Sequence, residues 1–382
     1  MAQNLNIDDC WSAFLERLPA DLDLSATARR CGAFKRARGV RSAEDLLRLA
    51  LIYGTTSHSL RGTVAWALAE GVAKMSDVAL LFRLQSCEGW LHDMVSGLLS
   101  RAVRPVASPS MFDRRVRLID GTVISSPGSG KGNWRLHADY DLRAGRFIGF
   151  ELSDRHGSES LARFEPAPGD LFVGDRYYAK AGQLSHVVEH GGDFLVRRGL
   201  TSCRLQYPDG RALDMGALLK TLTPDRTLDL PVLVPLSGAG GRAPLAARLI
   251  IRHIGEEGAA KARRRARRKA AKNGQTASDK RLKAAEYIML LTSLPAEQAS
   301  IDHLLGVYRL RWQIELAFKR LKSLMGLNDL LAKDPKLVRS CLYAKLILAL
   351  ITEDITSEVL DSFPSAPARP SAVNLAAAAA HL

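Results

Sequence analysis

Four residues between positions 308 and 322 place a phenol, a guanidinium, a carboxylate and an ammonium group at helical spacing. They are Tyr308, Arg311, Glu315 and Lys322. Residues 301–327 have the apolar periodicity of one long helix, on which these side chains would share an arc of roughly 60° beside the buried stripe. The three donors suit phosphate oxygens, and the carboxylate suits a metal ion. The alternative is a solvated helix face, in which the pair between Arg311 and Glu315 contributes only about 0.2–0.5 kcal/mol.

Two aspartates each follow a short apolar run that is typical of a β-strand. Asp120 follows residues 116–119, and Asp175 follows residues 170–174. An aspartate at a strand end is most often a turn former, so neither residue alone marks a site. If the fold brings both to one sheet edge together with Glu315, their carboxylates would hold divalent cations.

A further polar group lies within residues 133–142, where polar and apolar residues alternate without exception. His137, Asp139 and Asp141 fall on the polar face and are the nearest substitutes for the two aspartates. Alternation with a period of two is typical of a half-buried antiparallel strand. We therefore expect this face to point to solvent.

The chain is strongly basic, with a net charge of +14 and a pI near 9.8. Residues 261–286 carry eleven basic and two acidic residues, so most of the excess lies in one arm that includes Arg264, Arg265, Arg267 and Arg268. Such a field favours an anionic partner, with nucleic acid first and an anionic membrane second. A solvated loop is the alternative, although closely spaced cations repel one another unless phosphates or counterions neutralise them.

A helical region and then a mixed sheet must position these groups. Residues 1–110 have helical periodicity, with Ser42 as a candidate N-cap. Two short helices in residues 59–84 predict either a DNA-reading helix-turn-helix or part of a packed helical domain. The strands that follow, at 116–119, 133–142, 146–152, 170–174 and 194–197, with a helix ending near 190, indicate an α/β fold with a ribonuclease H-like mixed sheet.

These elements divide the chain into four parts. An all-α DNA-binding domain is expected at residues 1–110, and a ribonuclease H-like catalytic domain at 111–200 and 287–352. Residues 201–286 are expected to form an inserted β-rich subdomain with the basic arm. Residues 353–382, rich in Pro, Ser and Ala, are predicted to be a flexible tail.

The five cysteines, Cys10, Cys31, Cys87, Cys203 and Cys341, are odd in number and lack any C-x2-C spacing. Neither a disulfide framework nor a zinc site is therefore indicated. The N-terminal residues lack the pattern of a signal peptide, and no run approaches eighteen apolar residues. The sequence thus predicts a cytoplasmic protein that does not span a membrane.

The spacing Tyr308-x2-Arg311-x3-Glu315-x6-Lys322 resembles the signature of the DDE transposases of the insertion-sequence-four family. The segment VRLIDGT places Asp120 where that family has its first carboxylate, and LFVGDR places Asp175 at the second. The resemblance covers nearly the whole chain, with two departures. Tyr177 stands where the family usually has a small residue, and the region after Glu315 is short.

The resemblance implies a cut-and-paste DNA transposase. Asp120, Asp175 and Glu315 would be its catalytic residues and the ligands of two Mg2+ ions, with Mn2+ able to substitute. It would hydrolyse double-stranded DNA at terminal inverted repeats, pass through a hairpin intermediate and join target DNA, acting as a homodimer that pairs two ends. Tyr287 would stack on a base displaced during hairpin formation. Further DNA contacts are expected from Tyr308, Arg311, Lys322, Arg197 and Arg198.

Two other functions remain open from the sequence. A related metal-dependent nuclease would keep the three acids and cut DNA without joining it. A domesticated, non-catalytic regulator would bind DNA through the basic arm and the helical domain without any metal. The intact set of acids argues against the regulator.

Overall fold

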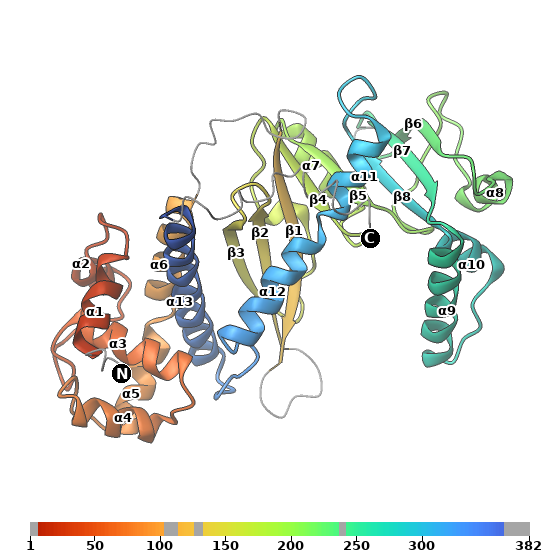
Figure 1. Cartoon of the computed structure of the whole chain (residues 1–382). Helices are drawn as coiled ribbons and strands as arrows, with labels where there is room; N and C mark the ends of the chain where they lie inside the picture. The colour runs from red at the N-terminus through yellow and green to blue at the C-terminus, as the bar shows by residue number, and fades with distance from the viewer. Residues whose placement is uncertain (1–6, 103–113, 126–132, 237–241, 363–382) are drawn as a thin grey trace.

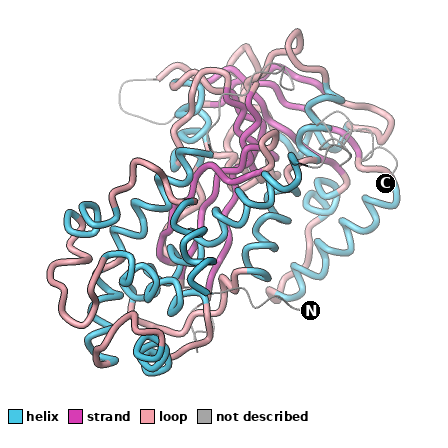
Figure 2. The backbone as a smooth tube through the Cα atoms, turned by 60° about the vertical axis from the view of Figure 1, so that its left-hand side comes forward, coloured by secondary structure: helices cyan, strands magenta, loops and turns pink. Residues whose placement is uncertain are grey.

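The computed structural model describes residues 7–102, 114–125, 133–236 and 242–362, and Figures 1 and 2 show how its elements are arranged. The described residues 7–102 form six helices: α1 (Ile7–Glu16), α2 (Leu24–Arg30), α3 (Ala43–Thr55), α4 (Leu60–Ala69), α5 (Asp77–Ser86) and α6 (Glu88–Ala102). Ser42 is the N-cap of α3, and its hydroxyl accepts a hydrogen bond from the Asp45 N–H at 3.0 Å. The helical N-terminal region predicted from periodicity is therefore present.

The last described helix, α13 (Pro335–Ser362), runs back beside the first helices and packs along α6, α3 and α5 (Figure 1). The sequence predicted a flexible tail from residue 353, and this boundary is wrong. Residues 353–362 continue α13, and Asp354 on it forms an ion pair with Arg146 at 2.5 Å. The rest of the predicted tail lies outside the described residues.

Eight strands form one mixed sheet in the order β3-β2-β1-β4-β5-β8-β7-β6. The first five are β1 (Arg115–Ile124), β2 (Trp134–Asp141), β3 (Arg146–Asp154), β4 (Asp170–Gly174) and β5 (Asp193–Arg197). Strands β1, β2 and β3 pair antiparallel, whereas β4 and β5 run parallel to β1. This is the ribonuclease H-like mixed α/β sheet that the sequence predicted.

The insertion extends this sheet. Its strands are β6 (Leu228–Val234) and β7 (Leu245–His253), which join the core through β8 (Tyr287–Thr292). The helices around the sheet are α7 (Ala181–Glu189), α8 (Met215–Thr221), α9 (Glu256–Lys272), α10 (Asp279–Ala285), α11 (Ile301–Arg309) and α12 (Trp312–Leu324), with the short 3-10 helix η2 (Leu161–Arg163). Figure 1 shows α9 and α10 projecting together from the end of the sheet that is far from α13.

The predicted long helix 301–327 is two helices. Helix α11 ends at Arg309, and α12 begins at Trp312 with Arg311 at its N-cap position. The residues at the break keep helical dihedral angles or hydrogen bonds to the preceding turn. The apolar periodicity of the sequence therefore continues across the break and does not reveal it. The single-helix arc predicted for the four polar residues is thus wrong for Tyr308, which lies on α11.

Two apolar cores lie on opposite faces of the sheet. Leu118, Leu171 and Leu195 point into the core shared with α12, α13 and the N-terminal helices. Ile119 and Phe172, one position along, point into the core beneath α7 and the insertion. Because successive side chains alternate across a strand, β1 and β4 are buried on both faces.

This double burial corrects the expectation for the polar face of β2. His137, Asp139 and Asp141 are each 1% exposed rather than solvent-facing. Asp139 pairs with Arg117, and Asp141 accepts from Arg115 Nε at 2.8 Å. The alternating pattern identified the strand correctly. It could not show that β1 and β3 place arginines and other residues over the polar side of β2 and bury it.

Candidate active site

The first two predicted acids lie side by side on the same face of the sheet. In the parallel pair formed by β1 and β4, Leu118 lies opposite Val173. Asp120 and Asp175 each lie two residues beyond these partners, so their side chains point to the same face. Asp120 is within β1 rather than at its end, because β1 continues to Ile124 against β2. Asp175 directly follows the last residue of β4, and its Oδ1 accepts from the Tyr177 N–H at 2.7 Å.

The third acid comes from the helix that crosses this face. Glu315 lies in the first turn of α12, which packs on β1. Arg311 joins the two elements, because its guanidinium contacts Glu315 through Nη2 and lies 3.5 Å from Asp120 Oδ2 through Nη1. One cation therefore bridges the first and third carboxylates.

The electrostatics of Asp120 show that these acids are crowded. Burial raises the pKa of Asp120 to about 7, opposed by a hydrogen bond from the Gly121 N–H and by Arg311, and the charges of Asp175 and Glu159 raise it further. A carboxylate among other carboxylates favours its protonated form unless a cation offsets the repulsion. The site is thus built to hold positive charge.

Glu159 is a fourth carboxylate that the sequence analysis missed. Its pKa is raised by burial first and then by Asp175, while Arg135, at 3.6 Å, acts against the rise. A Cβ on Gly121 would meet the Glu159 side chain at 3.4 Å, an ordinary van der Waals contact, so Glu159 packs next to the residue that follows Asp120. Glu159 stands in a loop, and no strand end or helical spacing marks it.

Tyr308 and Lys322 differ from the surface donors that the sequence predicted. Tyr308 is 8% exposed, burial raises the pKa of its hydroxyl, and the Arg311 guanidinium lies 5.9 Å from its ring centroid. Its ring therefore backs Arg311. Lys322 lies seven residues after Glu315 on α12, or about 10 Å along the axis, and partial burial lowers its pKa.

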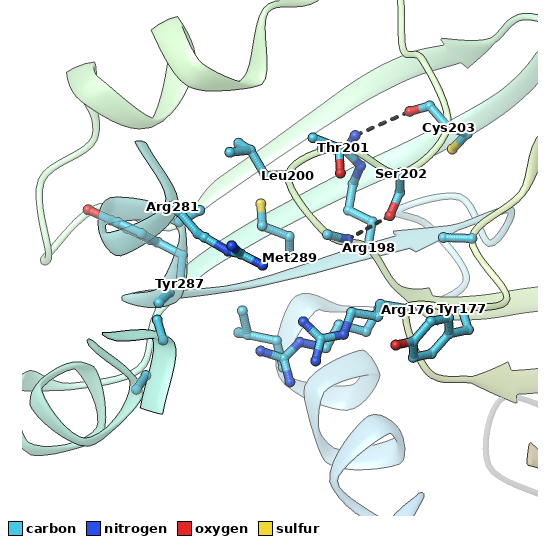
Figure 3. Close-up of a pocket in the computed structure, with 18 of the residues that line it drawn as sticks. Arg176, Tyr177, Arg198, Leu200, Thr201, Ser202, Cys203, Arg281, Tyr287 and Met289 are labelled. Atoms are coloured by element: carbon cyan, nitrogen blue, oxygen red, sulfur yellow. Dashed lines mark hydrogen bonds between the residues drawn. The ribbon is translucent and has the colours of Figure 1, made fainter. Parts of the chain in front are cut away.

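A cleft of about 1680 Å³ begins next to Asp175 and extends toward the insertion (Figure 3). Arg176 and Tyr177 border it on the core side, and Tyr177 is 56% exposed. Eight further basic residues line the cleft together with apolar residues of β8 and the insertion; they are Lys180, Arg197, Arg198, Arg204, Lys261, Arg265, Lys269 and Arg281. The cleft therefore offers cations and one exposed aromatic ring beside the acids.

The two neighbouring arginines predicted to bind DNA have different environments. Arg197 is exposed at the end of β5 and lines the cleft. Arg198 is 2% exposed, and its Nη2 donates to the Cys203 carbonyl at 3.2 Å (Figure 3). Its guanidinium is part of the cleft wall, so the prediction of a surface phosphate contact is wrong for Arg198.

The basic arm is the helix α9, not a loop. Arg264, Arg265, Arg267 and Arg268 are exposed on it, and within the described part of the chain none of the four forms an ion pair. Elsewhere on the arm, Arg263 pairs with Glu286 at 2.7 Å. Arg265 also lines the cleft, so α9 brings at least part of its positive charge to the cleft.

Tyr287 does not present a stacking surface. It is 1% exposed, and its hydroxyl donates to the Leu222 carbonyl at 2.9 Å. The ring belongs to the core beneath the insertion. The prediction that Tyr287 holds a displaced base is therefore corrected. The position of a residue at the start of a strand does not show which face of that strand other elements will bury.

Three carboxylates from two parallel strands and a crossing helix, on this mixed sheet, are the arrangement expected of an enzyme that cleaves phosphodiesters with divalent cations. Residues 111–351 match the family model described as the transposase DDE domain. The InsL transposase of insertion sequence IS186A from Escherichia coli strain K12 is 38% identical over 93% of this chain and 96% of its own length. The transposase of insertion sequence IS421 from Escherichia coli has the same identity and coverage.

The chain belongs to the DDE transposase family, and it is an insertion-sequence transposase. A more distant relative, the transposase of IS231E from Bacillus thuringiensis subsp. finitimus, is 25% identical over 64% of this chain and 56% of its own length. A solved structure of the piggyBac transposase synaptic complex with hairpin DNA matches 96% of this chain and 79% of its own chain, with a TM-score of 0.46 and 10% identity.

None of the described helices is both long enough and apolar enough to cross a lipid bilayer.

Proposed function

We propose that this transposase cuts double-stranded DNA at the terminal inverted repeats of its element and joins the freed ends to target DNA, with Asp120, Asp175 and Glu315 as its catalytic residues. The observation that carries the proposal is the bridge from Asp120 through Arg311 to Glu315, beside Asp175 and the basic cleft. The bridge joins a strand and a helix that the chain separates by almost two hundred residues.

The donor set fits divalent metal ions. Carboxylate oxygens are the ligands that Mg2+ prefers, and the pKa of Asp120 is raised by burial first and then by the charges of Asp175 and Glu159, both of which a bound cation would offset. Asp120, Asp175 and Glu315 would hold two Mg2+ ions, or Mn2+ in their place. When bound, such a pair supplies electrostatic stabilisation of the attacking and leaving oxygens of an in-line displacement.

The remaining residues of the site orient the DNA. The Arg311 guanidinium, held by Asp120 and Glu315 and backed by the Tyr308 ring, is placed to donate to a non-bridging phosphate oxygen. Arg197 and Lys322 provide further positive charge. The family resemblance adds that the 3′ hydroxyl left by the first cut attacks the opposite strand to give a hairpin, which a water molecule then opens.

The cleft and α9 supply the DNA backbone contacts. The four arginines of α9 that form no ion pair among the described residues, together with the cations of the cleft, would contact phosphates in place of their counterions. Helices α4 and α5, each with a serine N-cap, remain the candidate pair for reading the repeat. We further infer a homodimer that pairs two element ends, acting in the cytoplasm.

The proposal is tested with the purified full chain, a labelled DNA that carries the element's inverted repeat, and Mg2+. The proposal expects nicks at the repeat end, a hairpin product and strand transfer to a plasmid. Cut ends without transfer would identify the related nuclease. Binding without metal and without any cleavage would identify a non-catalytic regulator. A chain that cleaves equally well with Asp175→Asn would show that the acids are assigned wrongly.

A further inference from the structure

A second cluster of metal-ligating side chains lies away from the catalytic acids. Glu165, His186 and His190 each offer a ligand atom, and these atoms lie within 4.8 Å of one another. The two histidines are four residues apart at the end of α7, so they share one helix face. Glu165 comes from the loop that leads into β4.

The cluster and the catalytic acids lie at opposite ends of β4. Glu165 precedes the strand, which begins at Asp170, whereas Asp175 follows it. Five residues of strand span about 16 Å, so a metal ion at one end cannot share ligands with the other. The two sites are therefore independent.

Hydrogen bonding leaves both imidazoles with a nitrogen free for a metal ion. His190 Nδ1 lies 2.7 Å from the His186 carbonyl oxygen, so Nδ1 carries the proton and Nε2 keeps its lone pair. A hydrogen bond of this kind to a backbone carbonyl is typical of metal-bound histidines. His186 Nε2 is buried, and no hydrogen-bond partner for it occurs among the residues that the structure describes. The two rings are 4.2 Å apart.

The backbone around the cluster is fixed by close packing. The Glu165 carbonyl accepts from Arg117 Nη1 at 2.8 Å. A Cβ on Gly192 would come within 3.1 Å of Pro166, and a Cβ on Gly191, whose φ is +79°, within 3.1 Å of Pro168. Because glycines allow this approach, the loop with Glu165 and the turn after α7 are held together before any ion binds.

The chemistry of the ligand atoms also favours a cation at this position. Glu189, next to His190, is engaged by Ser185 and by Arg242, so it does not compete as a ligand. Two neutral imidazoles and one carboxylate suit a borderline divalent transition metal, with water at the remaining positions. Such a set binds Mg2+ poorly, because Mg2+ prefers oxygen ligands.

We propose that Glu165, His186 and His190 form a site for a transition-metal ion of the Zn2+ class. The ion would tie the end of α7 to the loop before β4, and so stabilise the strand whose other end carries Asp175. This inference does not depend on the DNA chemistry of the catalytic acids, because it is tested by measuring the binding of the metal ion rather than the cleavage of DNA.

The test is titration of the full chain with Zn2+ and with Co2+ in the presence of excess Mg2+. We expect one tight equivalent that raises the melting temperature, and Co2+ absorption bands of nitrogen and oxygen ligation without a thiolate charge-transfer band. His190→Ala, at an exposed position, should weaken binding by at least about ten-fold, and Glu165→Gln should also weaken it. His156→Ala, an exposed histidine elsewhere, is the matched control.

Two results would overturn the site. One is the absence of a tight equivalent in the wild-type chain. The other is unchanged affinity in the His190→Ala chain, which would assign the bound ion to other groups. The chain with Asp175→Asn should retain the equivalent, because the proposal places the ion outside the catalytic acids. A further variant, His186→Ala, removes the ligand atom that is buried. Circular dichroism shows whether this variant is folded.

Discussion

The acids at the sheet and the arginines of α9 show two opposite uses of charge. Asp120 is largely buried, touches Arg311 and has a pKa raised to about 7. Arg264, Arg265, Arg267 and Arg268 are exposed and have no ion-pair partner among the described residues. The acids depend on a few fixed distances, whereas the helix presents many equivalent cations.

This difference indicates how substitutions in each region should affect function. A buried, coupled group loses its function when one atom changes, because its neighbours were arranged around it. Exposed cations contribute to DNA affinity roughly in proportion to the phosphates they neutralise. Single substitutions should therefore be decisive at the acids and gradual on α9.

The largest effect is expected for the acids. Asp175→Asn or Glu315→Gln should lower the rate of repeat-end cleavage by at least about a thousand-fold, because each change removes a charged ligand in the transition state. DNA affinity should stay near that of the wild type. Gel-based cleavage and binding assays on the same DNA measure both quantities. If these variants lost DNA binding and cleavage to the same extent, the acids would act through DNA affinity, as the arginines of α9 are expected to do.

Replacement of all four α9 arginines by alanine should weaken binding to any DNA by about a hundred-fold at moderate salt. It should also reduce the slope of log affinity against log salt by up to about four units. Alanine keeps the helix, so loss of structure is not expected. The same four positions changed to lysine provide the control and should keep the slope. An unaltered slope in the alanine chain would make α9 a solvated helix.

Arg311 combines features of the two regions, because it is an arginine like those of α9 but lies among the acids. Arg311→Lys keeps the charge but cannot bridge Asp120 and Glu315 with two nitrogens. We expect cleavage to fall by about ten- to a hundred-fold with little change in DNA affinity. Arg309→Lys, on the exposed end of α11, should leave both unchanged. If Arg311→Lys affected affinity alone, Arg311 would act like the arginines of α9.

Tyr177 is the exposed aromatic at the border between the acids and the cleft. An aromatic platform contributes about 1–3 kcal/mol for each stacked base. Tyr177→Ala should therefore weaken binding of single-stranded or distorted repeat ends by about ten-fold, whereas Tyr177→Phe should behave as the wild type. Fluorescence of 2-aminopurine placed near the cleavage site would report the stacking. Identical quenching with all three chains would exclude it.

The smallest effect is on stability and follows from the pKa of Asp120. Its folded pKa is raised above the unfolded value, so ionisation opposes folding, and stability is lost as pH rises from about 4 to about 7. Without metal, Asp120→Asn should stabilise the chain at pH 8 by on the order of 2 kcal/mol and leave it unchanged near pH 4. Chemical denaturation at both pH values measures this. A wild-type chain that is the more stable at pH 8 would contradict the raised pKa.

The sequence predicted the parts of the fold that have strong local signals. Period-two and period-3.6 patterns located the strands and most helices, and the spacing around Glu315 singled out the segment that forms α12. What the sequence could not show was burial that depends on distant neighbours. Tyr287 and Arg198 have the types and positions of DNA contacts, yet Tyr287 packs into the core beneath the insertion and the loop after β5 covers Arg198. Glu159 reaches the site from a loop and packs beside Gly121, a relation that no spacing reveals.

Helix α13 has a consequence for how the chain is made. The core of the N-terminal domain contains Leu342, Ile347 and Leu350 from this helix, which pack with residues of α3 and α6. A ribosome therefore releases α1–α6 long before their last packing partner is synthesised. Domains that need distant segments fold late and expose apolar surface until those segments arrive. The helices proposed to read the repeat should reach their final packing only when synthesis is nearly complete.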